Sequence, residues 1–532
     1  MNILGKLSIS LSKSTIATAT SLIFLSYILS SVLGLLRNRI LAQFFGDSSE
    51  LGVFYLADKL PSFLFSTIVF TVLSASFIPL CVSLTKKGKS ELNTFVSGSV
   101  VFFLFLYSLI ILPILFFPNF FANLLSWNSL SKEYNNLLSS ILIWDLVSQL
   151  FFILVSFFSS YLQSLKKFFV PALTPIIYNS GVIFGILLFS GPYGIYSTII
   201  GMFIGNLISL FFIIVFLQRI NFNFSFNFFK YLLNPYTKKL ILIASPRFMG
   251  ILLQRLYILL IGGLISFIYK NPAYLVIYEY ANQLQSMPVQ AFGNSLSQVL
   301  FPTFSELAEG EKNRLIAKTL NRYVLKLTYF IMPVICVFFI LKIPIVRILY
   351  GGDKFSWLGT NLTSYTLAFF SISIWFQSLN TVFFRVFYSF KNSVTPTYSS
   401  FIALFLSFGL SVYFGLYLGY GLWSLALSFS IGSIVQTFFL YFFLYKKIGP
   451  VFIFSTKKYI KIFYSTLITG FILYLLMQFF DTYVFDTTRT LPLVLFTLTV
   501  VLIGFSSYFV FLDLVGVKIL RKLIIRVIYI LK

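Results

Sequence analysis

The chain has 532 residues, of which 58% are hydrophobic and only 10% are charged, and its formal net charge is +25. A soluble domain is about 25% charged, so this composition excludes a soluble protein and indicates one embedded in lipid. Lys and Arg gather in the cytoplasmic loops of membrane proteins, so we predict no nucleic-acid partner. Histidine is absent and the cysteines are Cys81 and Cys336, so we expect no metal site and no cofactor.

Long apolar runs predict about fourteen transmembrane helices, because a span needs roughly 20 apolar residues. The runs are too long and continuous for the alternating strands of a membrane barrel, so the expected fold class is an all-α polytopic membrane protein. In chain order the predicted spans are 14–36, 60–83, 92–117, 138–163, 170–190, 193–217, 240–268, 273–302, 322–342, 361–389, 395–417, 420–445, 459–479 and 490–512.

Basic residues alternate in density between successive loops. One set of loops holds most of them, including Lys86, Lys87 and Lys89 after the second span and the tail that ends at Lys532. The opposite set holds few. Because basic residues stay on the cytoplasmic side, we predict that both termini are cytoplasmic.

An internal repeat divides the chain. Ser164 to Pro171 (SLKKFFVP) resembles Ser389 to Pro396 (SFKNSVTP), and YGIYS at Tyr193 resembles YGLWS at Tyr420. The offset is about 225 residues (389 minus 164), and six predicted helices separate equivalent points, so the halves form parallel lobes as in some secondary transporters. We predict an N-lobe over 1–220, a C-lobe over 221–450, and a segment over 451–532 with the last two helices and a basic cytoplasmic tail.

Prolines recur at equivalent places in the two lobes. Pro79 in SFIPL corresponds to Pro302 in VLFPTF, and Pro61 and Pro288 lie in the same pair of spans. Each proline breaks a helical hydrogen bond. Taken singly they are tolerated kinks, but as a repeated set they are candidate hinges for lobes that rock about a central cavity.

No catalytic or nucleotide-binding motif accompanies these helices. The only P-loop lookalike, GKS at Gly88, lacks the first glycine and the preceding strand. No acid–base pair can be assembled with confidence. We therefore predict a transporter rather than an enzyme, driven by an ion gradient, the membrane potential or the substrate gradient.

Charges inside the membrane are the candidate functional residues, because each is costly unless it is paired or wet. Cations outnumber carboxylates, which favours an anionic substrate, and arginine suits phosphate through its planar fork. The candidate substrate-binding cations are Arg37, Lys59, Arg247 and Arg255. Asp145 and Glu279 are candidate ion-coupling carboxylates. Interfacial side chains or structural ion pairs remain the alternative for each.

The sequence resembles the MurJ/MviN family of lipid II flippases. The resemblance is carried, in order, by Ser31 to Gly46 (SVLGLLRNRILAQFFG), Leu56 to Phe65 (LADKLPSFLF), Tyr278 to Leu307, Tyr350 to Phe355 (YGGDKF) and Phe387 to Pro396. It implies the fold of the multidrug/oligosaccharidyl-lipid/polysaccharide exporter superfamily, a cationic cavity for the diphosphate head, and a groove at the last two helices for the polyprenyl tail. It also implies a bacterial cytoplasmic membrane and a role in peptidoglycan synthesis.

The resemblance has departures. The family usually carries arginine at the places of Ser31, Phe65 and Gln283, whereas Arg37 is retained and Lys59 matches the motif of the second span. The position of Gln283 is kept as a substrate-binding candidate.

Lipid II translocation from the cytoplasmic to the outer leaflet by alternating access is the leading hypothesis. The alternatives are a flippase for another polyprenyl-diphosphate oligosaccharide, an ion-coupled drug antiporter of the same superfamily, and a non-transporting scaffold of the cell-wall machinery. Expected partners are lipid II or a related lipid-linked sugar, membrane lipids and the cell-wall synthesis machinery.

Overall fold

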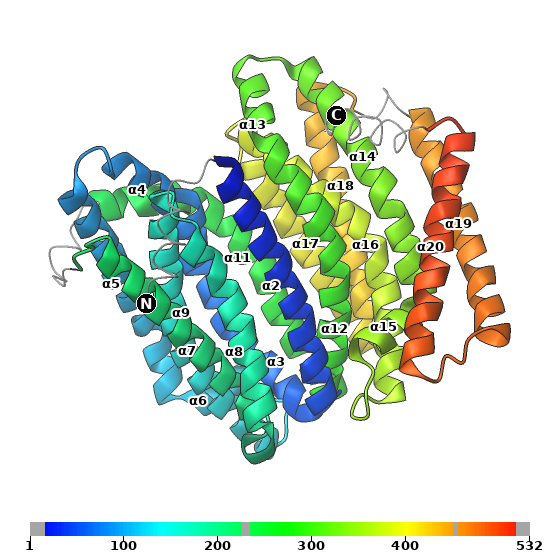
Figure 1. Ribbon diagram of the computed structural model, residues 1–532, viewed down its shortest axis with the longest axis horizontal. Helices are drawn as coiled ribbons and strands as arrows, with labels where there is room; N and C mark the ends of the chain where they lie inside the picture. Colours follow the sequence, from blue (N-terminus) through cyan, green and yellow to red (C-terminus); the bar gives the residue numbers. More distant parts are fainter. Residues whose placement is uncertain (1–15, 225–234, 452–455, 518–532) are drawn as a thin grey trace. The chain divides into compact units, whose positions relative to one another are not determined.

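The computed structural model describes residues 16–224, 235–451 and 456–517 (Figure 1). Within these ranges the secondary structure consists of helices joined by turns and short loops, and the contacts divide the chain into two compact units. The first unit comprises Met1–Val276 with Gly352–Phe355, and the second comprises Ile277–Gly351 with Ser356–Lys532.

The first unit contains the helices up to α11. They are α2 (Ile16–Phe45), α3 (Ser49–Leu64), η1 (Phe65–Phe70), η2 (Leu73–Phe77), α4 (Ile78–Leu84), α5 (Lys89–Phe116), α6 (Pro118–Leu125), α7 (Lys132–Ser164), α8 (Phe169–Tyr193), α9 (Tyr196–Arg219) and α11 (Pro235–Tyr269). The η elements are π-helical turns within longer helices. The rod formed by α3, η1, η2 and α4 corresponds to the second predicted span.

The second unit repeats this series and adds a hairpin. Its elements are α12 (Ala273–Pro288), η3 (Val289–Asn294), α13 (Ser295–Glu309), α14 (Asn313–Ile340), α15 (Lys342–Tyr350), α16 (Trp357–Ser389), α17 (Val394–Val412), η4 (Tyr413–Tyr417), α18 (Trp423–Ile448), α19 (Thr456–Tyr483) and α20 (Thr490–Leu514). The first turn of α12 belongs to the first unit.

About fourteen membrane-crossing helices are confirmed. Among the described residues, twelve helices are long and apolar enough to span a membrane. The two other predicted spans, 14–36 and 273–302, fall on α2 and on the continuous run from α12 through η3 to α13. The all-α fold class is therefore confirmed.

The repeat is visible element by element. Helices α3 and α12 both have 16 residues and begin 224 positions apart (273 minus 49). Helices α5 and α14 both have 28 residues, and α7 and α16 both have 33. Even the short α6 recurs as α15, next to the long helix that follows it in each half.

The repeat extends to a rare backbone feature. The π-helical turn η1 begins at Phe65 and η3 begins at Val289, again 224 positions later (289 minus 65). Such turns are uncommon and occur often at functional sites. Their recurrence at equivalent places shows that the irregularity belongs to the fold.

Helix α11 belongs to the second sequence repeat but to the first compact unit. Helix α11 opens the second repeat, yet it packs on α3, η1 and η2 and so belongs to the first compact unit. The predicted lobes with boundaries at residues 220 and 450 follow the sequence repeat, and they stay a prediction.

Close helix packing in the first unit depends on glycine. Gly181 and Gly185 of α8 face Gly201 and Gly205 of α9, and a Cβ on Gly201 would lie 2.7 Å from the carbonyl oxygen of Gly181. Small residues let membrane helices approach closely where lipid supplies no hydrophobic driving force. The equivalent pair in the second unit, α17 and α18, meets at Gly432 and Ser407 in the same way.

The last two helices form an antiparallel hairpin on the second unit (orange and red in Figure 1). Helix α19 packs on α14, and the Tyr508 hydroxyl of α20 donates to the carbonyl oxygen of Tyr329 at 2.9 Å. Leu473, Phe496 and Val500 join the hairpin to the end of α14 in a buried cluster. The hairpin is therefore an integral part of this unit.

Candidate functional site

Arg37 lies in the second half of α2 with its side chain half-buried. Its Nε and Nη2 atoms donate to Oδ1 of the adjacent Asn38 at 3.4 and 3.3 Å. These long hydrogen bonds engage two of the five N–H donors of a guanidinium. The remaining donors can form two parallel hydrogen bonds to two oxygens of one phosphate group. Ser31, where the family usually has arginine, lies exposed on the same helix.

Lys59 of α3 is only 6% exposed. Its aliphatic stem lies against Gly262 of α11, where an added Cβ would come within 2.7 Å of the Lys59 Cδ atom. The absent side chain of Gly262 thus makes room for the lysine. The structure places Lys59 beneath α11, and its role in substrate binding stays a prediction.

Asp58 precedes Lys59 and is half-buried. The Ser62 hydroxyl, one turn further along α3, contacts both carboxylate oxygens of Asp58 at 3.1 and 3.2 Å. Ser66, a further turn on, donates to the Ser62 carbonyl oxygen at 2.6 Å. A polar strip therefore runs along α3 from Asp58 to the beginning of η1.

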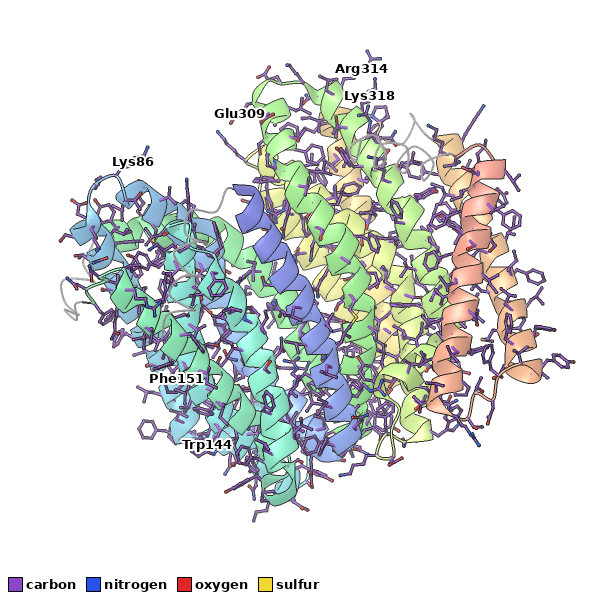
Figure 2. All side chains as sticks on the ribbon, in the orientation of Figure 1. Lys86, Trp144, Phe151, Glu309, Arg314 and Lys318 are labelled. Carbon is purple, nitrogen blue, oxygen red and sulfur yellow. The ribbon has the colours of Figure 1, made fainter. Side chains whose placement is uncertain are left out.

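Asp145 of α7 is completely buried, at 0% exposure. The preceding residue, Trp144, is 53% exposed and packs edge-on against Phe203 on the outer surface of the unit (Figure 2). Helix α7 therefore directs its aromatic side chain outward and its carboxylate into the core. The structure brings Asp145 into electrostatic contact with Asp58 of α3.

Helix α11 carries the two other predicted cations. Arg255 is exposed near the middle of the apolar stretch Phe248–Tyr269. A charged side chain at that depth normally faces water or a protein cavity rather than lipid. The side chain of Arg247 lies outside the described residues, although its backbone is helical.

The predicted residues of the second unit lie on α12. Glu279 and Gln283 are both half-buried, and Gln285 just beyond them accepts from Gln377 of α16 at 2.7 Å. Further along α16, Asn380 donates to Gln436 of α18 at 3.1 Å. These hydrogen bonds join amide side chains, so they add polarity without adding charge beside Glu279.

The candidate hinge prolines accompany the π-helical turns. Pro61 is buried one turn before η1, and Pro288 is buried immediately before η3. Pro79 and Pro302 are exposed, in α4 directly after η2 and in α13 after η3. A proline beside a π turn leaves several backbone groups without the usual helical partner. A hinge role for these positions stays a prediction.

No role was assigned to Asp58 from the sequence. Asp58 and Asp145 are 87 positions apart (145 minus 58) on different helices, and no spacing rule links them. Tyr178 of α8 was also missed, and it interacts with Arg37 as well as with both carboxylates. The only local signal was the spacing of Asp58 and Ser62, which places both on one helical face.

A family model supports a specific relationship. The model described as lipid II flippase MurJ matches residues 41–499, which is most of the chain. The chain belongs to the MurJ family. This result confirms the resemblance carried by the first, second and eighth predicted spans.

Individual relatives of the MurJ family agree over nearly the full length. A probable lipid II flippase MurJ of Borreliella burgdorferi is 26% identical over 515 residues, covering 96% of this chain and 98% of that protein. A lipid II flippase MurJ of Thermosipho africanus is 28% identical over 447 residues, covering 84% of this chain and 88% of that protein.

Solved structures give the same result. A lipid II flippase MurJ in an inward closed conformation matches with a TM-score of 0.74 and 27% identity, covering 92% of this chain and 98% of that structure. An inward-facing multidrug resistance MATE family transporter matches with a TM-score of 0.65 at 12% identity, which shows a shared fold alone. The chain is thus a multi-pass membrane protein of a flippase family.

Proposed function

We propose that this chain is a lipid II flippase that moves its substrate from the cytoplasmic to the outer leaflet by alternating access. The observation that supports it is the retention of Arg37 within a chain that matches the MurJ family over residues 41–499. Among the described residues, only two of its guanidinium donors are engaged, both by Asn38. A diphosphate needs such a cation because burying it unpaired is costly.

All three usual arginine positions, at Ser31, Phe65 and Gln283, hold uncharged residues that cannot bind phosphate by charge. Phe65 begins η1 and packs on Phe152 with ring centroids 4.6 Å apart, and Gln283 is half-buried on α12. This loss keeps a second function open, translocation of another polyprenyl-diphosphate oligosaccharide. Drug antiport is less favoured, since such cavities use carboxylates for cations.

The lost arginine at Ser31 has a counterpart in the other repeat. Helices α2 and α11 end at Phe45 and Tyr269, 224 positions apart (269 minus 45). The same offset carries Ser31 onto Arg255, and both side chains are exposed. Arg255 therefore supplies, from the repeat-equivalent place, the cation that α2 lacks.

Arg255→Ala is expected to reduce lipid II flipping by about tenfold to a hundredfold, because a charge-assisted hydrogen bond contributes about 1.5–3 kcal/mol. The double variant Ser31→Arg with Arg255→Ala should recover most of the activity, since it moves the cation to the equivalent helix. Flipping is measured in reconstituted vesicles. Unchanged flipping in Arg255→Ala, or no recovery in the double variant, would contradict the compensation.

We further propose that both termini are cytoplasmic in a bacterial inner membrane. The turn after α4 is basic and firmly anchored: Lys87 Nζ donates to the Tyr236 hydroxyl at 3.1 Å, and Lys89 Nζ donates to the Ile220 carbonyl oxygen at 2.8 Å. The hydrogen bond from Lys87 to Tyr236 raises the pKa of this lysine and keeps it charged. In the second unit, Arg314 and Lys318 lie where α13 passes into α14 (Figure 2).

Cysteine labelling tests this topology. In a variant with Cys81 and Cys336 replaced by serine, a single cysteine at Lys86 should react with a membrane-impermeant maleimide only after the cells are opened. A single cysteine at Asn128, between α6 and α7, should react in intact cells. Reaction of both positions from the same side would overturn the orientation.

Cells depleted of their own lipid II flippase provide the decisive test of function. Expression of this protein should restore access of an added lipid II-degrading enzyme to lipid II at the outer face. Failure of restoration, with the protein inserted in the membrane, would favour the other lipid-linked oligosaccharides. Docking to the cell-wall synthesis machinery is part of this proposal, and co-purification from the restored cells tests it.

A further inference from the structure

The first unit contains a buried carboxylate that substrate binding does not explain. Within the described residues, neither oxygen of Asp145 has a hydrogen-bond partner of full geometry, although the side chain is completely buried. The side chains that act on it are Asp58 of α3 and Gln149, one turn further along α7. An unpaired carboxylate in an apolar core takes up a proton rather than remain charged.

Within the part of the chain that the structure describes, the side chains that act on Asp145 directly include no cation. Tyr107 of α5 and Tyr178 of α8 interact with it electrostatically, and α9 presents the neutral Asn206, which donates to Ser148 at 3.2 Å. Asp58 is the second carboxylate. Two carboxylates in one low-dielectric site cannot both ionise readily, so they titrate as a pair.

A proton fits this site better than a metal ion. Ca²⁺ takes six to eight oxygen ligands and Mg²⁺ requires near-octahedral geometry. Among the described residues, no group of three His, Cys, Asp or Glu side chains is placed to hold a metal ion. Asp58 is already held by Ser62, and it is half-buried whereas Asp145 is inaccessible. Asp58 is therefore the more accessible member of the pair for proton exchange with water.

The repeat shows that this feature is not required by the fold. The offset of 224 carries Asp58 onto Asn282 of α12, and the matching helices α7 and α16 carry Asp145 onto Phe370, which is fully buried. An amide and an aromatic ring fill the same two places in the second unit. The frame therefore folds without the carboxylates, so their presence in the first unit points to function.

Tyr178 connects the pair of carboxylates to Arg37, the candidate substrate-binding cation. It interacts with Arg37 as well as with Asp58 and Asp145, and its neighbour Asn179 donates to the carbonyl oxygen of Ser30 on α2 at 3.4 Å. When the pair carries one proton its charge is −1. When that proton passes to water, two carboxylates remain, and they attract the Arg37 guanidinium away from a ligand.

We propose that Asp58 and Asp145 form a proton-binding site that holds one shared proton in this conformation, and that loss of the proton weakens diphosphate binding at Arg37. The second half of this inference rests on the proposed function. Because linkage is reciprocal, bound lipid II favours the protonated pair by the same factor.

Infrared spectroscopy tests the proton site without any substrate. The protein is reconstituted in vesicles of phosphatidylethanolamine and phosphatidylglycerol, and the carbonyl band of a protonated carboxylic acid is followed at neutral pH in H₂O and D₂O. The wild type and Asp58→Asn should show the band, and Asp145→Asn should lose it. Asp513→Asn, at an exposed carboxylate of α20, is the matched control and should retain it. A wild type without the band overturns the proposal.

Lipid II binding tests the coupling. The affinity of the wild type should fall at least about fivefold as the pair loses its proton at alkaline pH, the lower end of usual coupling. Asp145→Asn should bind equally well across this range, since its single remaining carboxylate cannot form the double negative charge, whereas Asp58→Asn should show a smaller fall because it keeps the proton of Asp145 without the second carboxylate. The second variant serves if Asp145→Asn fails to fold.

Failure of the proposed function and failure of the proton coupling give different results. A carboxyl band that Asp145→Asn removes, in a protein that binds no lipid II at any pH, would refute the proposed function and leave the proton site standing. Normal lipid II binding that does not vary with pH in the wild type would refute the coupling. Undiminished pH dependence in both Asp variants would show that another group carries it.

Discussion

Arg37→Ala is expected to abolish lipid II flipping while the protein remains folded and inserted. A guanidinium can bind a diphosphate through two parallel charge-assisted hydrogen bonds, each contributing about 1.5–3 kcal/mol. Loss of both would lower binding by about a hundredfold to ten-thousandfold, since 1.4 kcal/mol corresponds to a factor of ten. Among the described residues, the hydrogen bonds of the Arg37 side chain go to Asn38 at 3.3 Å or more, so the folded chain loses little when this side chain is removed.

Two variants separate this role from a general effect of charge. Arg37→Lys retains the charge but not the planar fork, so it should flip at an intermediate rate. Arg347 lies in the short helix α15 and stacks on Trp357, the first residue of α16. Arg347→Ala should leave flipping close to normal. The measurement is flipping in reconstituted vesicles at equal protein content. Wild-type rates in Arg37→Ala would refute the role of this residue.

Gly201→Leu is expected to destabilise the first unit severely. A Cβ at this position would lie 2.7 Å from both the Gly181 carbonyl oxygen and the Val182 Cα. These are backbone atoms of α8, so the two helices must separate. Overpacking costs about 1–3 kcal/mol and occasionally more, which exceeds the gain of about 0.5–1 kcal/mol from replacing a glycine within a helix.

The matched control is Gly191→Leu on α8, where nothing lies within 4 Å of an added Cβ. Its thermal unfolding midpoint in detergent should equal or exceed that of the wild type, whereas Gly201→Leu should unfold at a lower temperature and give less folded protein. Equal midpoints for the two variants would show that the contact between α8 and α9 is not limiting for stability.

The sequence predicted the helices well and their ends less well. Apolar runs identify spans because lipid demands them, and every predicted span falls on a helix. The beginning of α3 was missed because Glu50, Asp58 and Lys59 interrupt the apolar run. The helix nevertheless begins at Ser49, since the Ser48 hydroxyl accepts from the Leu51 amide at 3.3 Å and caps it.

The candidate site was predicted only in part. Arg37 and Asp145 could be identified singly, because a charge within an apolar run is conspicuous. The pairing of Asp145 with Asp58, and the burial of Lys59 against Gly262, depend on which helices pack together. Residue spacing along one helix does not encode that packing. The π-helical turns were also missed, because propensity and hydrophobic pattern do not distinguish them from an α-helix.

Those turns have a consequence for interpreting sequence variation. Each residue of an α-helix advances the direction of its side chain by about 100°, and a π turn accommodates one residue more than an α turn. A helical wheel drawn through Phe65–Phe70 or Val289–Asn294 therefore assigns every later position to the wrong face. In a mutational scan, the period of tolerated positions in α12 should reappear in α13, after η3, with its phase rotated by about a quarter of a turn.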